Sequence, residues 1–350
     1  MWMHARWTRL GALLILLVMS GGAFAVDLCP GLSQRQADQQ VATRIAAVAC
    51  DEHLRWNRPF IDAEGRIVSA SSYEAEGGGL RDGGGPWRRV AFYWQTAGLL
   101  GQMSHRSGAS DCGYAAQNAG YPGLGCRGFV VDSPWSAAFI SWVMQRAGVP
   151  AFRSSASHFD YVRAARTNPA GSPYLFMEPR TTPPATGDML CYVRTNRVYG
   201  YQGLGTTIDG GANGLAMHCD VVVAAVGGKA YLVGGNVQQA VTMRMVNLNA
   251  SGQWWGLPQR TEGDVECSPD TPAACHLNRQ DWAVLLKLKP QSELAKLGPV
   301  TPPTFLPQQS VPQTCCVNCV VGSGAPRCPA QGQSLLPAQD PAHTPLQGAE

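Results

Sequence analysis

The stretch from Ser133 to Pro150 has the pattern of a short helix that is buried on most of its surface. Ser133 is a favoured residue before a helix, and Pro134 suits the first helical position, where a missing N–H costs nothing. Gly148 and Pro150 are typical of a helix end. Apolar side chains recur between them at helical spacing, at Trp135, Ala138, Phe139, Trp142 and Ala147. The pattern predicts a helix in the interior of a folded domain.

Ser136 lies in the first turn of this predicted helix. Unpaired N–H groups and the positive end of the helix dipole favour a developing negative charge there, which suits the nucleophile of an acyl transfer. A serine hydroxyl is a poor nucleophile by itself and needs a base within hydrogen-bond reach. The alternative interpretation is a small residue packed at a helix start, in a protein without catalytic activity.

Several motifs follow one another along the chain: the helix around Ser136, Gly187-Asp188 before an apolar strand, His218 at the start of another strand, and Gly234-Gly235-Asn236. In this order they resemble papain-like cell-wall hydrolases of the NlpC and CHAP type, in which a cysteine usually takes the place of Ser136. The whole pattern, serine included, is similar to the bacterial domain-of-unknown-function family 2272. The resemblance covers roughly residues 86–290 and implies cleavage of an amide bond.

His218 is the predicted base. It opens a strand on which Asp220 and Val222 share its face, and the near-neutral pKa of histidine suits general acid–base catalysis. The alternative is a hydrogen-bonded structural histidine. His158 is the rival base, but it lies near a predicted helix start and is interpreted as a surface pair with Asp160.

Asn236 is the predicted orienting residue for the His218 ring. In a regular hairpin Asn236 would point away from His218, so we predict a bulge at Gly234-Gly235 that moves it by one position. Without the bulge, Gln238, Gln239 or a backbone carbonyl would take this role. The oxyanion would be bound by the N–H of Ser136, with the N–H of Trp135 as a candidate second donor. The side chain of Trp135 is the candidate substrate-binding residue.

The N-terminal segment and the cysteines of the chain indicate export. Residues 1–25 combine a basic start, a short apolar run and a small-residue cleavage site, which is the pattern of a secretory signal peptide. The twelve cysteines fit an oxidising compartment, the periplasm or the extracellular space. Four local pairings are favoured: Cys29 with Cys50, Cys112 with Cys126, Cys191 with Cys219, and Cys267 with Cys275.

The remaining composition argues against two kinds of partner. The net charge is +3 and the chain has no lysine-rich run, so we expect no nucleic-acid partner. Beyond the signal peptide, no segment has the roughly 20 apolar residues that a membrane span needs, so we expect no stable membrane insertion after signal cleavage.

Helical patterns precede strand patterns, which predicts an α+β fold. The resemblance makes it papain-like, with N-terminal helices packed on a small antiparallel sheet. Strands are predicted at 188–194, 218–226, 229–233, 241–248 and 281–288. The expected organisation is a signal peptide (1–25), a helix and Gly-rich loop (26–85), a hydrolase-type domain (86–290), and a Pro/Gln-rich, cysteine-containing disordered tail (291–350).

The export signals predict an exported protein, and the resemblance implies a hydrolase that cleaves an amide bond in peptidoglycan stem peptides or a related cell-wall amide. Ser136 would attack, His218 would carry the proton and Asn236 would orient it, without a metal or organic cofactor. Two alternatives stay open. One is a catalytically silent wall-binding module on the same fold, and the other is an acyl hydrolase or transferase that acts on esters or lipids.

Overall fold

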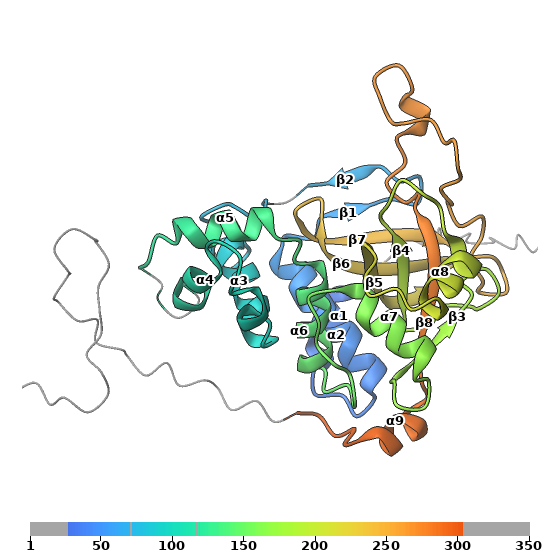
Figure 1. The fold of residues 1–350 in the computed structure, drawn as a ribbon, viewed down its shortest axis with the longest axis horizontal. Coiled ribbons are helices and arrows are strands. Elements are labelled where there is room, and N and C mark those ends of the chain that lie inside the picture. Colours follow the sequence, from blue (N-terminus) through green and yellow to red (C-terminus); the bar gives the residue numbers. More distant parts are fainter. Residues whose placement is uncertain (1–26, 71, 116–117, 119, 304–350) are drawn as a thin grey trace, which may run out of the picture. The chain divides into compact units, whose positions relative to one another are not determined.

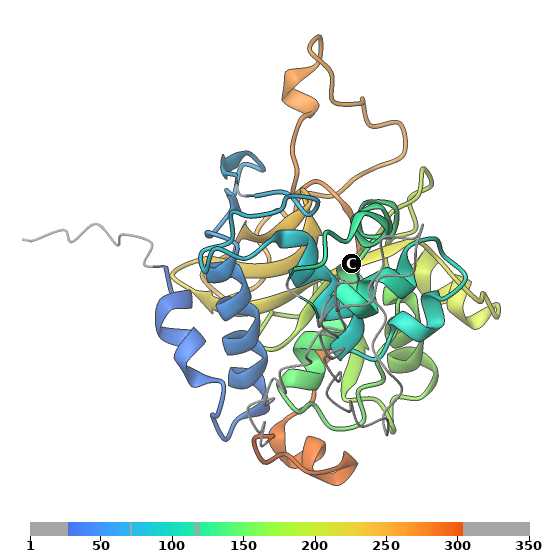
Figure 2. The ribbon, with the colours of Figure 1, turned by 90° about the vertical axis from the view of Figure 1, so that its left-hand side faces the viewer.

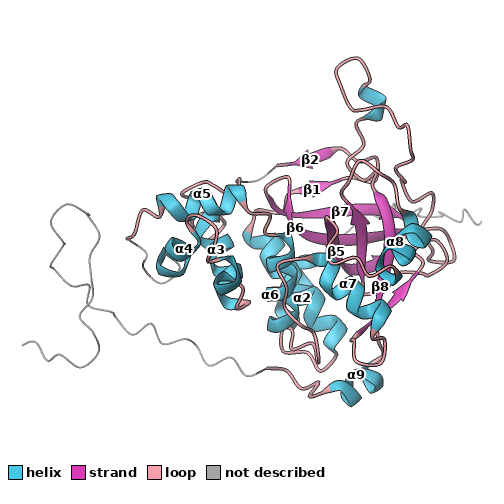
Figure 3. Cartoon of the chain, viewed as in Figure 1, coloured by secondary structure: helices cyan, strands magenta, loops and turns pink. Residues whose placement is uncertain are grey.

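A mixed β-sheet of eight strands forms the centre of the computed structural model, which describes residues 27–70, 72–115, 118 and 120–303. The strand order is β2-β1-β7-β6-β5-β4-β8-β3 (Figures 1 and 3). Neighbouring strands are antiparallel, except that β1 runs parallel to β7. The strands are β1 (Phe60–Ile61), β2 (Ile67–Ser69), β3 (Tyr174–Met177), β4 (Met189–Val193), β5 (Met217–Val226), β6 (Lys229–Val237), β7 (Ala240–Asn247) and β8 (Asp281–Leu288).

Helices surround this sheet, so the predicted α+β class is confirmed. The α-helices of the described residues are α1 (Cys29–Leu32), α2 (Val41–Arg55), α3 (Pro86–Thr96), α4 (Ala109–Ala115), α5 (Leu124–Asp132), α6 (Ser136–Arg146), α7 (His158–Thr167), α8 (Gly200–Asp209) and α9 (Gln291–Leu297). Short 3-10 turns lie at Ser33–Arg35, Leu100–Met103 and Pro272–Ala274. The sheet is larger than expected and is not wholly antiparallel.

The main core lies where α2, α6 and α7 pack against the strands, above all β5 and β6 (Figure 1). Gly235 on β6 is one reason for this close packing. A Cβ atom at Gly235 would lie 2.5 Å from the Cβ of Phe139 on α6, so only glycine lets the helix approach the strand this closely.

A second, smaller core is built on the strands from alternate residues, among them Leu190, Val222 and Leu232. Trp254, from the loop that follows β7, also packs into it. Further along, the same connection projects away from the sheet, as the two perpendicular views show in orange (Figures 1 and 2).

The β5–β6 hairpin has the predicted two-residue turn. Gly227 and Gly228 both have positive φ values, 61° and 73°, which is the conformation that a tight hairpin turn of the primed type requires. The hairpin fixes the register of β5 and therefore the positions of His218 and Asp220 near its beginning.

Several segments differ from the sequence-based expectation. Three glycine-containing stretches without a clear helix or strand pattern in the sequence, 57–85, 101–132 and 198–216, contain β1 and β2, α4 and α5, and α8, respectively. The disordered tail was expected from residue 291, yet α9 begins there and Leu294 is buried. The predicted signal peptide (1–25) and residues 304–350 of the predicted tail lie outside the described residues.

Four disulfides join the cysteine pairs that the sequence favours: Cys29–Cys50, Cys112–Cys126, Cys191–Cys219 and Cys267–Cys275. Such a set is typical of a protein outside the cytoplasm. Because Cys112 is bonded to Cys126, it has no free thiol that could act as a nucleophile. Among the helices of the described residues, none combines the length and the apolar character needed to cross a bilayer.

Candidate functional site

The first turn of α6 carries Ser136. The preceding helix α5 ends with Ser133 as its C-cap, and α6 begins at Ser136 with Trp135 as its N-cap residue. The helix therefore starts later than the sequence suggests, but Ser136 does lie in its first turn. No side chain caps this helix start. The N–H groups of the first turn and the positive end of the helix dipole therefore favour negative charge near the Ser136 hydroxyl.

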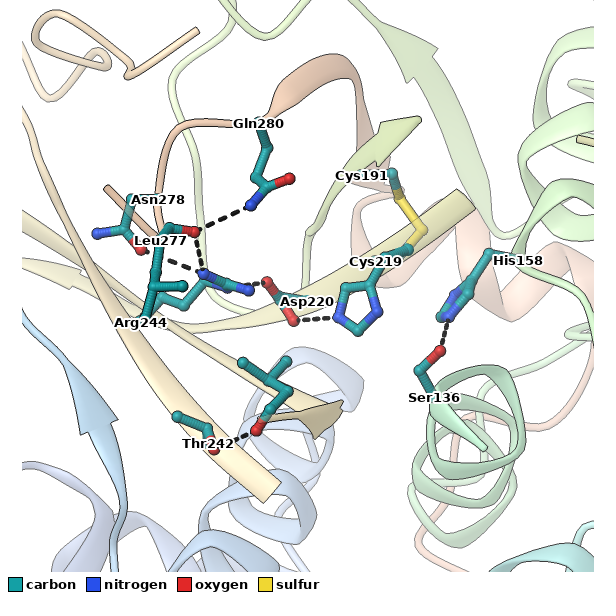
Figure 4. A network of polar contacts seen from close by, with 12 residues as sticks. Ser136, His158, Cys191, Cys219, Asp220, Thr242, Arg244, Leu277, Asn278 and Gln280 are labelled. Atoms are coloured by element: carbon teal, nitrogen blue, oxygen red, sulfur yellow. Dashed lines mark hydrogen bonds and ion pairs between the residues drawn. A yellow bond between two sulfur atoms is a disulfide. The ribbon is translucent and has the colours of Figure 1, made fainter. Parts of the chain in front are cut away.

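The Ser136 hydroxyl is hydrogen-bonded to His158, the first residue of α7. Ser136 Oγ lies 2.7 Å from His158 Nε2, and the other ring nitrogen of His158, Nδ1, is hydrogen-bonded to the hydroxyl of Tyr161 (Figure 4). Ser136 is 3% exposed and His158 is 4% exposed. The three residues form a chain of contacts, which we call the serine chain.

Electrostatics keep the serine chain neutral. Burial lowers the pKa of His158 well below its usual value, and the neighbouring His218 and Arg194 lower it further. Burial likewise raises the pKa of Tyr161 well above its usual value. At neutral pH His158 is therefore an uncharged imidazole, so one of its nitrogens is free to accept a proton.

A second buried chain of contacts lies beside the first and consists of His218, Asp220 and Arg244. His218 Nε2 lies 2.8 Å from Asp220 Oδ1, and Arg244 Nε donates to Asp220 Oδ2 over 3.0 Å (Figure 4). Arg244 also donates from Nη1 to the carbonyl of Leu277 over 2.7 Å. We call these residues the aspartate chain.

Burial opposes ionisation of Asp220, but His218 and Arg244 outweigh it and hold the pKa of Asp220 below its usual value. The pKa of His218 is also lowered, mainly by burial, although Asp220 acts in the opposite direction. Because Arg244 supplies a positive charge, Asp220 can be ionised while His218 stays neutral. His218 Nδ1 is buried and has no hydrogen-bond partner.

The two chains meet through their imidazole rings, whose centroids lie 5.2 Å apart. The sequence predicts a hydrogen bond from Ser136 to His218, whereas the structure pairs Ser136 with His158. His218 is directed to Asp220 because residues two apart on a strand share a face. His158 and Asp160, interpreted from the sequence as a surface pair, have different environments, since His158 is buried and Asp160 is half-buried.

β6 is irregular near Asn236, where its register with β7 shifts between Gly234 and Val237. The predicted bulge concerned the pairing with β5, in which the register shift lies instead between Val222 and Ala224. Asn236 itself has a positive φ of 55°. With its amide oriented to satisfy both neighbours, Asn236 donates from Nδ2 to Glu74 Oε2 over 3.1 Å and accepts at Oδ1 from the N–H of Trp135 over 3.3 Å. These contacts place the Asn236 amide at the start of α6, and the partner of the His218 ring is Asp220 instead.

The side chain of Trp135, expected to bind substrate, is fully buried. Its ring stacks on Trp56 and Tyr93, with centroid distances of 5.7 and 5.9 Å, and its Nε1 donates to Glu74 Oε2 over 2.6 Å. In this structure Trp135 therefore anchors the start of α6 in the core and offers no surface to a ligand.

The sequence contained signals for two residues to which its interpretation gave no role in the site. Asp220 is two residues after His218 on the same strand, which is the spacing that brings two side chains together on one face. Tyr161 follows His158 by three residues, which places both on one side of a helix. The contact between α6 and α7 that brings His158 to Ser136 is tertiary and has no signature in the sequence.

Fold and site define an α+β protein with a buried Ser–His pair at a helix start and a second buried histidine beside it. Residues 81–288, more than half of the chain, match the family described as "Uncharacterized protein conserved in bacteria (DUF2272)", and the chain belongs to this bacterial family. Neither a curated protein nor a solved structure matches the chain.

Proposed function

We propose that this protein is an exported acyl hydrolase that cleaves an amide bond in peptidoglycan stem peptides, with Ser136 as the nucleophile. The observation that carries the proposal is the 2.7 Å hydrogen bond between Ser136 Oγ and His158 Nε2 at the uncapped start of α6. A hydroxyl, a neutral imidazole and a helix start are the parts that acyl transfer to serine needs. The periplasm or the extracellular space is the proposed location, because the described residues contain four disulfides.

The mechanism begins with the tautomer of His158. If the ring proton of His158 is on Nδ1, this N–H donates a hydrogen bond to the Tyr161 oxygen. Nε2 then has the free electron pair that accepts the proton of Ser136. The Ser136 oxygen then bonds to the substrate carbonyl carbon, and the N–H groups in the first turn of α6 stabilise the oxyanion. His158 next gives the proton to the leaving amine as the C–N bond breaks. Water, activated by the same imidazole, hydrolyses the acyl-enzyme.

His218 is the second candidate for the base. Its Nε2 is occupied by Asp220, and its Nδ1 is buried without a partner. An imidazole held by a carboxylate on one nitrogen and free on the other has the arrangement of a general base. Rotation of the Ser136 hydroxyl away from His158 would be needed for His218 to take this role.

A papain-like arrangement is part of the proposal. Its support is the order of the parts: a helix that carries the nucleophile comes first, and an antiparallel strand that carries a histidine comes later, in contact with that helix. The buried Asp220 would then hold the His218 ring, as an orienting residue does in such sites.

A catalytically silent wall-binding module is the second candidate function. The observation in its favour is the burial of the reactive groups, since Ser136, His158 and His218 are 3%, 4% and 1% exposed. A hydrolase built on this site must therefore open the start of α6 to substrate. An ester or lipid acyl hydrolase or transferase would use the same chemistry, for which a serine nucleophile is common.

Digestion of purified wall sacculi tests the proposal. Wild-type protein, Ser136→Ala and Ser141→Ala are incubated with sacculi, and the soluble products are analysed by mass spectrometry. Ser141 is the matched control because it lies on the same helix but bonds to the backbone of Ser155. We expect muropeptides with a newly cleaved amide from wild type and Ser141→Ala only. Retention on sacculi without any release would favour the silent module.

A further inference from the structure

A pocket of about 690 Å³ lies against the face of α7 that carries Tyr161. It is bounded by residues 151–155 before α7, by α7 itself and by residues 171–174 after it. The volume is in the range of pockets that hold a small ligand. We propose that this pocket binds a ligand with an apolar body and one carboxylate group.

Aromatic rings line part of this pocket. The ring of Phe152 neighbours two tyrosine rings, with its centroid 5.4 Å from that of Tyr161 and 6.4 Å from that of Tyr174. Both tyrosine hydroxyls are already engaged, because Tyr174 donates to the carbonyl of Gly187 over 3.1 Å and Tyr161 is bonded to His158. Both tyrosines are buried, so the half-buried ring of Phe152 is the aromatic surface that would cover the apolar body of the ligand.

The charged residues of the pocket select the polar group of the ligand. Arg163 is paired with Asp160 over 3.1 Å, and the other oxygen of Asp160 accepts from Ser155 Oγ over 2.6 Å. Arg153 is exposed, and within the described part of the chain no carboxylate lies within ion-pair distance of it. Arg153 is thus the uncompensated positive charge of the pocket, and a guanidinium binds carboxylate with two parallel hydrogen bonds.

Tyr161 connects the pocket to the serine chain. It lines the pocket, and its hydroxyl is bonded to His158 Nδ1. A ligand on the Tyr161 ring would therefore contact the residue that holds the His158 tautomer. On the basis of the proposed function, the occupant is a carboxylate-bearing portion of a peptide substrate, although binding to the pocket does not itself require catalysis.

Titrations followed by protein NMR test this assignment with two probes that share one aromatic body and differ in a single group, a charged carboxylate or a neutral amide. N-acetyl-L-phenylalanine supplies an aromatic body with a carboxylate, and its primary amide supplies the same body without the charge. We expect the carboxylate to bind up to about fivefold more tightly, because fivefold corresponds to the upper range for an accessible ion pair. The shifted resonances should belong to residues within 151–174.

Two arginine variants identify the charge that is responsible. Arg153→Gln should remove the preference for the carboxylate, and Arg180→Gln, at an exposed arginine outside the pocket, should keep it. Equal affinity for both probes, no binding of either probe, or shifts confined to other parts of the protein would overturn the assignment.

A third variant separates this assignment from the proposed function. Ser136→Ala should bind N-acetyl-L-phenylalanine like the wild type, because the pocket does not include Ser136. Binding with an unreactive Ser136 would thus support the pocket and contradict the hydrolase. A reactive Ser136 without binding would contradict the pocket alone.

Discussion

His158 and His218 come from different elements, α7 and β5, yet their rings lie with centroids 5.2 Å apart in the interior of the protein. Each ring is held by one neighbour of its own, His158 by Tyr161 and His218 by Asp220. Only His158 is hydrogen-bonded to Ser136. The site therefore contains two neutral imidazoles, of which one is bonded to the candidate nucleophile and the other is not. Replacing each histidine separately distinguishes their roles.

The first prediction concerns these two histidines. His158→Gln should lower the rate of amide cleavage by about 10²–10⁴-fold, because a general base contributes that much and the amide of glutamine cannot take up the proton. His218→Gln should have a smaller effect, because its ring does not contact Ser136. The rates of muropeptide release from sacculi provide the measurement. The reverse order of the two effects would assign the base to His218.

A second prediction concerns Gly234, which lies on β6 opposite Asp220. A Cβ atom at Gly234 would lie 1.7 Å from Asp220 Oδ1, and that carboxylate is held by both His218 and Arg244. Gly234→Ala should therefore displace Asp220, destabilise the fold and lower activity.

Gly214→Ala is the matched control, because a Cβ atom at Gly214 meets nothing within 4 Å. Free energies of unfolding from urea titrations, together with activity, test the effect. A Gly234→Ala protein as stable and as active as Gly214→Ala would show that the aspartate chain tolerates displacement.

A third prediction concerns the buried ion pair of Arg244 and Asp220. Arg244→Met should lower the free energy of unfolding by about 3–5 kcal/mol, because it leaves the Asp220 carboxylate buried without its cation. Asp220→Asn in the same chain should recover part of this loss, since it removes the unpaired charge. Urea unfolding of both single variants and the double variant measures the coupling. Strictly additive effects would contradict an interaction between the two side chains.

The fourth prediction concerns the stability at acidic pH. Burial lowers the pKa of His53 from 6.5 to about 4, and its Nε2 donates to the carbonyl of Pro59 over 3.0 Å. Between these two pKa values the unfolded chain binds more protons than the folded one. The stabilisation by neutral His53 is therefore complete above pH 6.5 and is lost as the pH falls towards 4, by about 3 kcal/mol at most.

His53→Gln keeps a donor for Pro59 but cannot titrate, so its loss of stability relative to wild type should be smaller at pH 5 than at pH 7. His105→Gln, at an exposed position, is the control. Urea unfolding at several pH values supplies the comparison. The same difference between wild type and His53→Gln at every pH would show that His53 does not contribute to acid destabilisation.

The sequence carries most of the information on the sheet, because the apolar runs of β5, β7 and β8 and the paired glycines at 227–228 are local signals. It also locates Ser136 at a helix start. Two-residue and three-residue strands such as β1 and β2 have too few residues for a recognisable alternation. The glycine-rich sequence of α8, Gly200–Asp209, gives no helical signal of its own, so its structure depends on packing against β8.

The candidate site is less predictable than the sheet. The roles of His158 and Asn236 depend on where loops and helices meet in space, and such contacts join residues that are far apart in the chain. Ser136 and His158 are separated by 22 residues, and Asn236 reaches Glu74 from another part of the fold. Two contacts do follow from local geometry: Asp220 and His218 share one face of β5, and His158 and Tyr161 share one side of α7.

The most direct measurement for the nucleophile is labelling with a fluorophosphonate probe, followed by peptide mapping of the modified residue. Wild type and Ser141→Ala should be labelled, with the probe on Ser136, and Ser136→Ala should not be. Labelling should also decrease in His158→Gln. Equal labelling of wild type and Ser136→Ala, or no labelling of the folded wild-type protein at all, would contradict an acyl-transfer nucleophile at the start of α6.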